Sequence, residues 1–498
     1  MHTLAAAFAH TLARRGNEAA VLFEGERLTF ADVDRNTRGV AATLAAAGVN
    51  PGDRVAVGLT NSPDLIAFVL GVIRAGAVLV PLNPAYSADE LLYAVGDSGA
   101  RMAVVEPEHA AILEGGRLPG LSVIRGGSAP PESRAPLVEA GCGAEATALI
   151  VYTSGTTGRP KGVMLSHRAL LTNLTTVAQA WRWTENDRLL LSLPCFHLHG
   201  LGLGIVASFI VGSSIALRRR FVAEETLPDL ERCEATMFFG VPTMYNRLVS
   251  LPEEMIAGSD LSRMRLWVSG SAPLSAATFE RFRNRFGTEL LERFGMTECG
   301  FALSGPYGAP RRPGVVGFPL PGVEARIVDP EAAASGRLVD VAQGTSGELI
   351  LRGPNLFSGY WNRPQETARA VQDGYLLTGD LAQREADGMI RIVGRSSVDI
   401  IKTRGFKVGA VEIEDCLQRH PLVQEVAVVG VPDADQGERV VAAVTLEAGA
   451  SVDPEELRIF ARQHLAPHKV PTRIVLLDEI PRTGPGKFKK KELIRMLT

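Results

Sequence analysis

The chain has 498 residues, of which 46% are hydrophobic and 21% charged, with a formal net charge of −3. This composition is typical of a globular protein, the length calls for more than one domain, and the slight negative charge argues against nucleic-acid binding. The five cysteines are far apart and form no C-x-x-C pair, so no disulfide framework or zinc site is expected. A reducing compartment fits, either the cytoplasm or an organelle matrix.

The first third of the chain alternates helix and strand signals. Residues 31–47 have apolar side chains at helical spacing and end at Gly48, before a Pro-Gly turn signal. A strand over 54–59, a helix over 64–75 and a strand over 77–81 follow. This βαβα order predicts a large α/β domain of parallel sheets covered by helices.

Later segments extend this pattern and then change it. Further buried strands are predicted at 146–152, 235–239, 266–269 and 289–291, and a β-rich subdomain at 324–328, 347–351 and 389–393. The last hundred residues predict a small α/β unit, with helices over 411–418 and 454–465 and strands over 425–431 and 440–446. We therefore expect an N-terminal domain over 1–393, a hinge over 394–399 and a mobile C-terminal domain over 400–498.

One uncharged stretch, 198–217, is long enough to span a bilayer. It contains His199, four glycines and three serines, which favours a buried helix–strand passage instead. No integral membrane segment is expected.

The strongest local signal is a Gly/Thr-rich loop after a predicted strand: Thr153, Ser154, Gly155, Thr156, Thr157 and Gly158, followed by Lys161. Glycines allow the backbone to approach a bulky anion, hydroxyls add donors, and Lys161 adds a positive charge. Pro160 stands where a nucleotide P-loop would open a helix, so this is a different kind of loop. From composition, a phosphate-binding loop and a flexible surface loop remain equally open.

This loop resembles the phosphate loop of the adenylate-forming superfamily, which includes acyl-CoA synthetases, firefly luciferases and adenylation domains of peptide synthetases. Four further segments match that family in the same order, at 294–298, 375–380, 394–395 and 481–487. The resemblance covers nearly the whole chain. It implies an acyl-CoA synthetase that joins a carboxylic acid to ATP, releases pyrophosphate, and transfers the acyl group to coenzyme A.

The resemblance also implies roles for individual residues. Glu298 would be the Mg²⁺ ligand, and Asp380 with Arg395 would hold the ribose, although a T-G-D segment is often only a turn. The implied catalytic residues are Lys487, which would reach the carboxylate and the α-phosphate, together with Lys161, Thr297 and His197. The other implied nucleotide-binding residues are Ser271, Ala272, Pro273, Glu292, Arg293, Phe294, Gly295 and Met296.

The hinge segment departs from the common family pattern by one apparent insertion after Arg395. Either Ser397 or Val398 could be the pivot of the domain rotation that the family uses between its two half-reactions. Gly405 would be the turn glycine on the face that serves the thiol step.

Several segments resemble the malonyl-CoA synthetase branch of the family. Ser269 lies in one of them and Ser304 in another, and His197 would gate the acyl pocket. Arg247 would pair with the second carboxylate of malonate, because a buried carboxylate needs a partner. Arg311 and Arg312 are further candidates.

The sequence leaves alternatives open for the role of Arg247, for the acid substrate and for the class of protein. Arg247 could lie on a helix surface and pair with Glu253 or Glu254. The acid could be a medium- or long-chain fatty acid in an apolar channel. A non-catalytic nucleotide-binding relative is the third class, but it would be expected to lack Lys487 or Glu298. The partners are thus a small-molecule carboxylate, ATP and coenzyme A, in a monomer or a homodimer.

Overall fold

The computed structural model describes residues 2–116, 118–126, 142–153, 160–395, 400–403, 406–433, 436–482 and 488–498. Its first part alternates α2 (Phe30–Ala46), β3 (Arg54–Gly58), α3 (Pro63–Arg74) and β4 (Val78–Pro81), as predicted. α3 begins where Ser62 accepts a hydrogen bond from the Leu65 N–H and Pro63 opens the first turn.

The smaller of two large sheets is built around these strands. Its order is β18 (Gly359–Tyr360), β8 (Lys161–Ser166), β7 (Thr147–Thr153), β4, β3, β5 (Met102–Val105) and β6 (Ser122–Arg125). β8 is antiparallel to β7, and Thr153 faces Lys161. The Gly/Thr-rich loop therefore connects two strands, which agrees with the prediction that it is not a P-loop.

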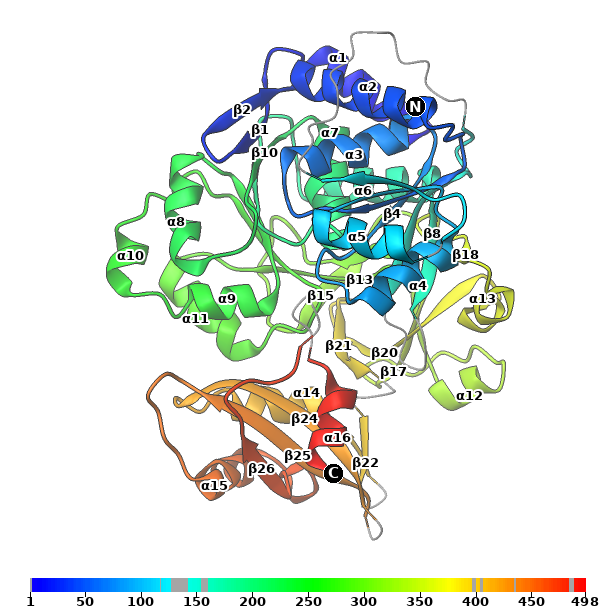
Figure 1. Cartoon of the computed structure of the whole chain (residues 1–498). Helices are drawn as coiled ribbons and strands as arrows, with labels where there is room; N and C mark the ends of the chain where they lie inside the picture. The colour runs from blue at the N-terminus through cyan, green and yellow to red at the C-terminus, as the bar shows by residue number, and fades with distance from the viewer. Residues whose placement is uncertain are drawn as a thin grey trace.

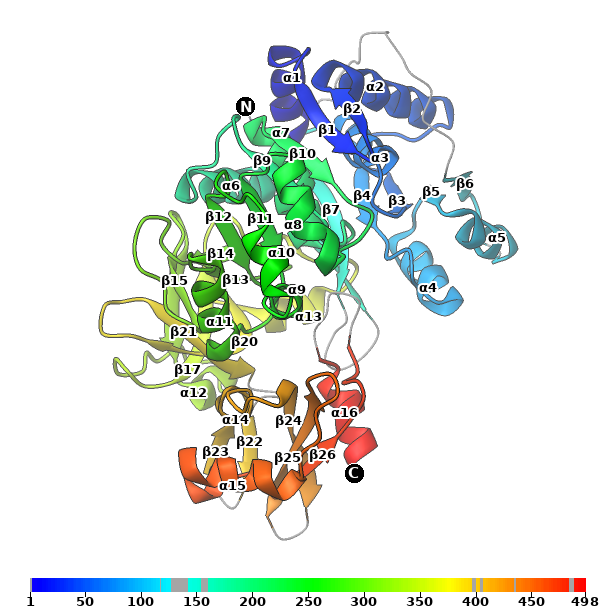
Figure 2. The same ribbon diagram turned by 90° about the vertical axis from the view of Figure 1, so that its left-hand side faces the viewer.

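The larger sheet contains both the remaining parallel strands and the β-rich part (Figure 2). Its order is β16 (Glu324–Val328), β17 (Gly347–Arg352), β20 (Tyr375–Arg384), β21 (Ile390–Arg395), β15 (Val315–Pro319), β14 (Gly300–Ser304), β13 (Leu291–Met296), β12 (Leu266–Ser269), β11 (Met237–Gly240), β9 (Arg188–Leu191), β10 (Ser214–Leu217), β1 (Ala19–Phe23) and β2 (Glu26–Thr29), with β19 (Val371–Gln372) paired to β20. The strands from β13 to β1 are parallel. Their carboxyl ends therefore meet at one edge, where ligands bind in such sheets.

β13 begins later than the sequence predicted. The expected strand at 289–291 is observed at Leu291–Met296, so it runs into the aromatic-Gly segment. A Cβ at Gly295 would lie 2.1 Å from the Gly300 carbonyl oxygen, so only glycine fits this close approach between β13 and β14. The shift places Glu292 and Arg293 on a buried strand.

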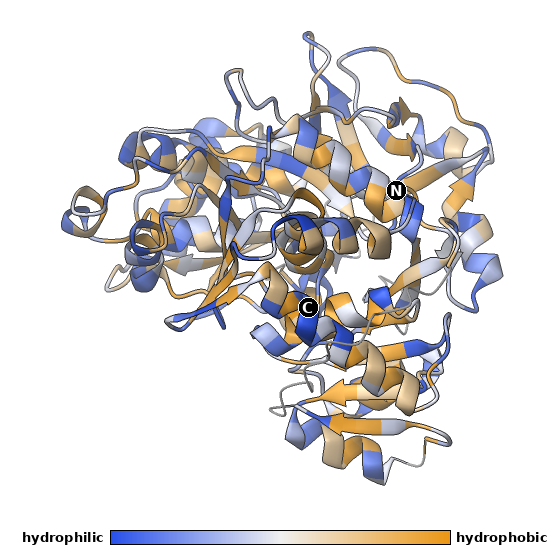
Figure 3. Cartoon of the chain, turned by 90° about the horizontal axis from the view of Figure 1, so that it is seen from above, coloured by the Kyte–Doolittle hydropathy of each residue, from blue (hydrophilic) through white to orange (hydrophobic). Residues whose placement is uncertain are grey.

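Helices cover both sheets. In Figure 3 the strands are largely hydrophobic, whereas the helices carry both hydrophilic and hydrophobic residues. Besides α2 and α3, these helices include α1 (Leu4–Arg14), α4 (Ala88–Ser98), α5 (Pro107–Gly115), α6 (His167–Ala180), α8 (Ala223–Arg232), α9 (Pro242–Leu248), α10 (Glu253–Ala257), α11 (Ala276–Phe286), α12 (Pro330–Ala334) and α13 (Pro364–Ala370).

The uncharged stretch is the predicted buried passage. It forms a π-helix (His199–Ala207), α7 (Ser208–Val211) and β10, and its side chains are almost all buried. Within the described residues, no helix is long and apolar enough to cross a membrane.

The C-terminal unit lies below the rest of the molecule (Figure 1). Its sheet contains β22 (Ile400–Thr403), β23 (Phe406–Gly409), β24 (Val423–Asp433), β25 (Gly437–Leu446) and β26 (Arg473–Leu476), with α14 (Ala410–Leu417), α15 (Pro454–His464), a 3₁₀ turn (Pro467–Lys469) and α16 (Lys490–Leu497) around it. Alternate residues of β24 and β25 enter separate apolar clusters on the two faces. The predicted fold class is confirmed: a large α/β domain with a β-rich part and a small α/β unit.

The predicted hinge falls at the junction of these parts. β21 ends in the larger sheet at Arg395, and β22 begins the small sheet at Ile400. Residues 396–399, including both candidate pivots, lie outside the described residues. α14 packs against β21 across this junction.

Candidate active site

A carboxylate, a phenol and an ammonium group adjoin one another where β8 meets β18. The Tyr360 hydroxyl donates to Glu298 Oε1 at 2.9 Å, and Lys161 Nζ lies 5.0 Å from the centroid of the Tyr360 ring. The pairing of Tyr360 with Val163 holds this segment against β8. Tyr360 thus links two residues that the sequence predicted for the phosphate end of the site, although Tyr360 itself was not predicted from the sequence.

The residues predicted to bind ribose also lie together. Asp380 on β20 and Arg395 on β21 are directly opposite in an antiparallel pair. Asp380 is 6% exposed, and its backbone N–H donates to Thr378 Oγ1 at 3.0 Å. The tight T-G-D segment is therefore part of a buried strand pair instead of an exposed turn.

A polar cluster occupies the carboxyl ends of β12 and β13. Arg293 Nη2 donates to Ser271 Oγ at 3.2 Å, and Ser271 Oγ lies 3.3 Å from His199 Nδ1. Ser271 has a φ of +72°, an unusual backbone conformation for a residue other than glycine. Such strain is common where a side chain is held for function.

Arg293 is a buried cation that no carboxylate of the described residues accompanies. Among the residues that the structure describes, Arg293 Nε, His199 Nε2 and Ser269 Oγ are buried and have no hydrogen-bond partner, and no carboxylate pairs with Arg293. Burial lowers the pKa of Arg293 to about 9 and moves that of His199 well below its usual value. The cluster therefore offers a positive charge and free polar atoms to an anionic ligand.

Glu292, the residue before Arg293, faces the other way, since successive strand residues point to opposite faces. Its Oε1 accepts a 2.7 Å hydrogen bond from the Gly314 N–H. Burial raises its pKa to about 8, and the charge of Asp415 on α14 adds to this rise. The structure thus separates two neighbouring residues that the sequence had assigned together to the nucleotide.

The other predicted residues lie in several environments. Phe294, Gly295, Met296 and Thr297 are half-buried where β13 ends, and His197 is half-buried with its ring 4.3 Å from that of Phe196. Half-buried Ala272 and exposed Pro273 follow Ser271. Ser154, Gly155, Thr156, Thr157, Gly158, Gly405 and Lys487 lie outside the described residues.

The residues predicted for the acyl pocket differ in burial and in hydrogen-bond partners. Arg247 is exposed on α9, and the carboxylate of Glu253 is 2.8 Å from Arg285. Ser304 accepts a 2.8 Å hydrogen bond from Trp181 Nε1, so the core already engages its hydroxyl. Arg311 donates to backbone carbonyls and Arg312 pairs with Asp387 at 2.6 Å. Arg293 thus differs from Arg247, Arg311 and Arg312 in being buried with no carboxylate partner in the part of the chain that the structure describes. Its position inside β13 was not evident from the sequence.

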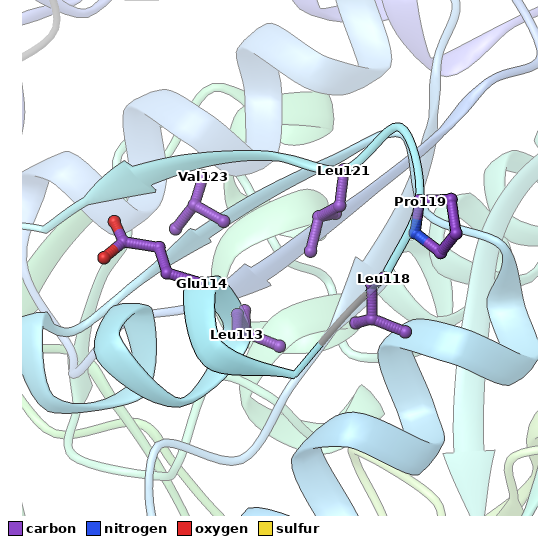
Figure 4. Close-up of a pocket in the computed structure, with 6 residues that line it drawn as sticks. All are labelled: Leu113, Glu114, Leu118, Pro119, Leu121 and Val123. Carbon is purple, nitrogen blue, oxygen red and sulfur yellow. The ribbon is translucent and has the colours of Figure 1, made fainter.

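Two surface hollows lie apart from this chemistry. One, of about 480 Å³, lies between α5 and β6 and is lined mainly by apolar side chains (Figure 4). The other, of about 830 Å³, lies between α11 and the C-terminal unit. Neither is lined by a residue that the sequence predicted for the site.

Comparison with known proteins agrees with this arrangement. Residues 8–361 match the family model "AMP-binding enzyme", and residues 412–487 match "AMP-binding enzyme C-terminal domain". The chain belongs to the AMP-binding enzyme family. It is an adenylate-forming acyl-CoA synthetase of the malonyl-CoA synthetase branch, an AMP-forming acid–thiol ligase that uses ATP, as the motifs predicted.

Individual relatives have related activities. The chain is 37% identical over 478 residues to the mitochondrial malonate–CoA ligase ACSF3 of Mus musculus, covering 89% of this chain and 82% of that one. It is 35% identical to a feruloyl-CoA synthase of an Amycolatopsis species, covering 96% and 95%. The ATP-bound structure of MatB from Rhodopseudomonas palustris superposes with a TM-score of 0.91 at 35% identity, covering 99% and 98%.

Proposed function

We propose that the protein converts malonate, ATP and coenzyme A into malonyl-CoA, AMP and pyrophosphate. The observation that carries this proposal is Arg293, a buried arginine without a carboxylate partner among the described residues. A second substrate carboxylate would supply the missing anion, and arginine can bind it through two parallel hydrogen bonds. A fatty acid would leave this charge buried and unpaired, which is strongly unfavourable.

In the first half-reaction a substrate carboxylate oxygen attacks the α-phosphorus of ATP, and pyrophosphate leaves. Positioning and charge neutralisation supply most of the rate enhancement in such a step. Lys161 would neutralise phosphate charge, Thr297 would donate to a phosphate oxygen, and Asp380 with Arg395 would hold the ribose. Lys487 would neutralise the reacting carboxylate and α-phosphate.

Glu298 suits a magnesium ion by its chemistry. It is a buried carboxylate, 7% exposed, oriented by the Tyr360 hydroxyl, and hard oxygen ligands are those that Mg²⁺ prefers. Bound there with the ATP phosphates, the ion would neutralise their charge. Glu298 and Thr297 are the residues that would adjoin it.

The second half-reaction transfers the acyl group from the adenylate to the coenzyme A thiol, releasing AMP. We propose that the C-terminal unit turns about the segment 394–399 between the two steps and that Gly405 then lies beside the incoming thiol. This rotation would withdraw Lys487.

The test compares CoA-ester formation from malonate, methylmalonate, acetate, octanoate, palmitate and ferulate. We expect malonate to have the highest kcat/KM and Arg293→Met to lower it about 100-fold, because a buried charge pair is lost. Arg247→Ala is the comparison, since the sequence assigned the second carboxylate to that exposed arginine. A larger loss in Arg247→Ala than in Arg293→Met would move the anchor to α9.

Other outcomes would overturn the assignment. Faster reaction with octanoate or palmitate, insensitive to both arginine variants, would make the protein a fatty acyl-CoA synthetase. Absence of pyrophosphate release with every acid would leave a non-catalytic nucleotide-binding protein.

A further inference from the structure

An aromatic ring lies beneath the guanidinium of Arg293. The Arg293 Cζ atom is 4.8 Å from the centroid of the Phe301 ring, within the range of a cation–π interaction. Phe301 is 3% exposed and Arg293 6% exposed, so water hardly screens the contact. The His199 ring is tilted toward the same phenylalanine, with 6.5 Å between ring centroids.

Asn173 on α6 fixes the backbone that carries this ring. Its side-chain amide accepts a hydrogen bond from the Phe301 N–H at 2.9 Å and donates to the Phe301 carbonyl at 2.7 Å. Asn173 is 4% exposed, and a Cβ at Gly300, whose φ is +60°, would lie 2.4 Å from Asn173 Oδ1. The start of β14 is therefore held from the helix side as well as by its neighbouring strand.

Few other contacts orient the Arg293 head group. Its Nη2 donates to Ser271, whereas Nε has no hydrogen-bond partner among the described residues. The ring of Phe301 and the hydroxyl of Ser271 together limit how the guanidinium can turn. A guanidinium must be held in this way if its fork is to match a carboxylate.

We propose that Phe301, held by Asn173, is a positioning residue that orients Arg293 and thereby sets the preference for a dicarboxylic acid. This inference rests on the proposed function. It assigns no contact between Phe301 and the second carboxylate: the ring acts through the arginine.

The test replaces Phe301 with mono-, di- and trifluorophenylalanine in the full-length enzyme. Fluorine withdraws electron density from the ring face and weakens a cation–π interaction while changing the side-chain volume little. We expect the KM for malonate to rise stepwise, by about three- to tenfold in the trifluoro form, with little change in kcat or in the KM for ATP. The KM for acetate should stay flat, since acetate has no second carboxylate to bind.

Phe282 provides the matched control. It is fully buried in the same domain and stacks on Phe286 at 4.5 Å, and the same fluorination there should leave every KM unchanged. Phe301→Leu gives a second measurement, in which malonate KM should rise at least as far as in the trifluoro form.

The outcomes separate this inference from the function on which it rests. A flat fluorination series in an enzyme that prefers malonate and needs Arg293 would overturn the role of Phe301 alone. A wild-type enzyme without malonate preference would overturn the proposed function, and this inference with it. Equal stepwise changes for malonate and acetate would also overturn it, because they would indicate general distortion of the site.

Discussion

The two faces of β13 bury residues of opposite charge in different surroundings. Arg293 faces Ser271 and Phe301 and has no carboxylate partner among the described residues, whereas Glu292 faces the Gly314 N–H and Asp415 of the C-terminal unit. Burial moves both pKa values toward neutrality, lowering that of Arg293 to about 9 and raising that of Glu292 to about 8. One charge is thus available to a substrate anion, and the other can be neutralised by a proton.

This difference shows how one strand can serve two purposes. Arg293 faces the site, whereas Glu292 lies near Asp415 of α14, the helix that packs against β21. Asp415 is itself largely buried against the N-terminal domain, where the backbone N–H of Ala276 faces it. β13 therefore supplies the site on one face and the contact between domains on the other.

Substitutions on the two faces should separate these purposes most strongly. Arg293→Lys keeps the charge but loses the planar fork, so we expect malonate kcat/KM to fall about 10- to 100-fold. Glu292→Gln should change malonate KM by less than about twofold. Steady-state kinetics with malonate on both variants tests this expectation. A larger loss of kcat/KM in Glu292→Gln than in Arg293→Lys would show that the two faces of β13 do not act independently.

Unlike Arg293, the buried carboxylate of Glu298 has a hydrogen-bond partner within the protein. Glu298 accepts a hydrogen bond from Tyr360, so Tyr360→Phe should leave its carboxylate less well oriented. We expect the Mg²⁺ concentration for half-maximal activity to rise about tenfold, in line with the loss of an outer contact to a metal ligand. Tyr375→Phe, the control, removes a tyrosine contact to Glu324 in the β-rich part of the larger sheet. An unchanged Mg²⁺ requirement would separate Tyr360 from metal binding.

The buried carboxyl groups of Glu292 and Asp415 should make the free energy of unfolding depend on pH. Burial raises the pKa of Glu292 to about 8 and that of Asp415 to about 7, where the charge of Glu414 adds to the rise and Arg419 and Arg391 oppose it. The folded protein thus holds protons that the unfolded chain releases near pH 4. Their contribution to stability is complete below that pH and is lost as pH rises through 7 to 8.

We therefore expect the free energy of unfolding to fall by roughly 1–3 kcal/mol between pH 6 and pH 9 through these two groups. Urea denaturation of Glu292→Gln/Asp415→Asn should show a much flatter profile over this interval. Lys469 and Glu412 pair with a closest N–O distance of 2.6 Å, with Glu412 half-exposed, so Glu412→Gln should keep the wild-type slope. Equal slopes in the double variant and the wild type would place the titration elsewhere.

Much of this arrangement could be predicted from the sequence because it depends on local patterns. Apolar spacing predicted the bounds of α2 and α3 to within one residue, and the ordered motifs assigned Asp380 and Arg395 to one site. Glu298 and Lys161 were likewise assigned from their motifs, and the structure connects them through Tyr360.

The remaining parts depend on contacts between distant segments. Tyr360 reaches Glu298 only because β18 pairs with β8, and the pairing leaves no local signal in either strand. The start of β13 was predicted too early, and hence the opposite directions of Glu292 and Arg293 could not be derived from their order in the chain. Burial, which distinguishes Arg293 from Arg247, is a property of the whole fold.

An exposed ion pair across the same junction gives the smallest expected effect. Arg281 on α11 lies 3.4 Å from Glu447 of the C-terminal unit, with side chains 49% and 32% exposed. Water and salt screen such a pair, so Arg281→Ala should change the free energy of unfolding by less than about 1 kcal/mol and leave the pH profile as in the wild type. If denaturation instead showed a loss clearly above about 1 kcal/mol, the exposed rim of the junction would contribute more to stability than a screened surface ion pair can.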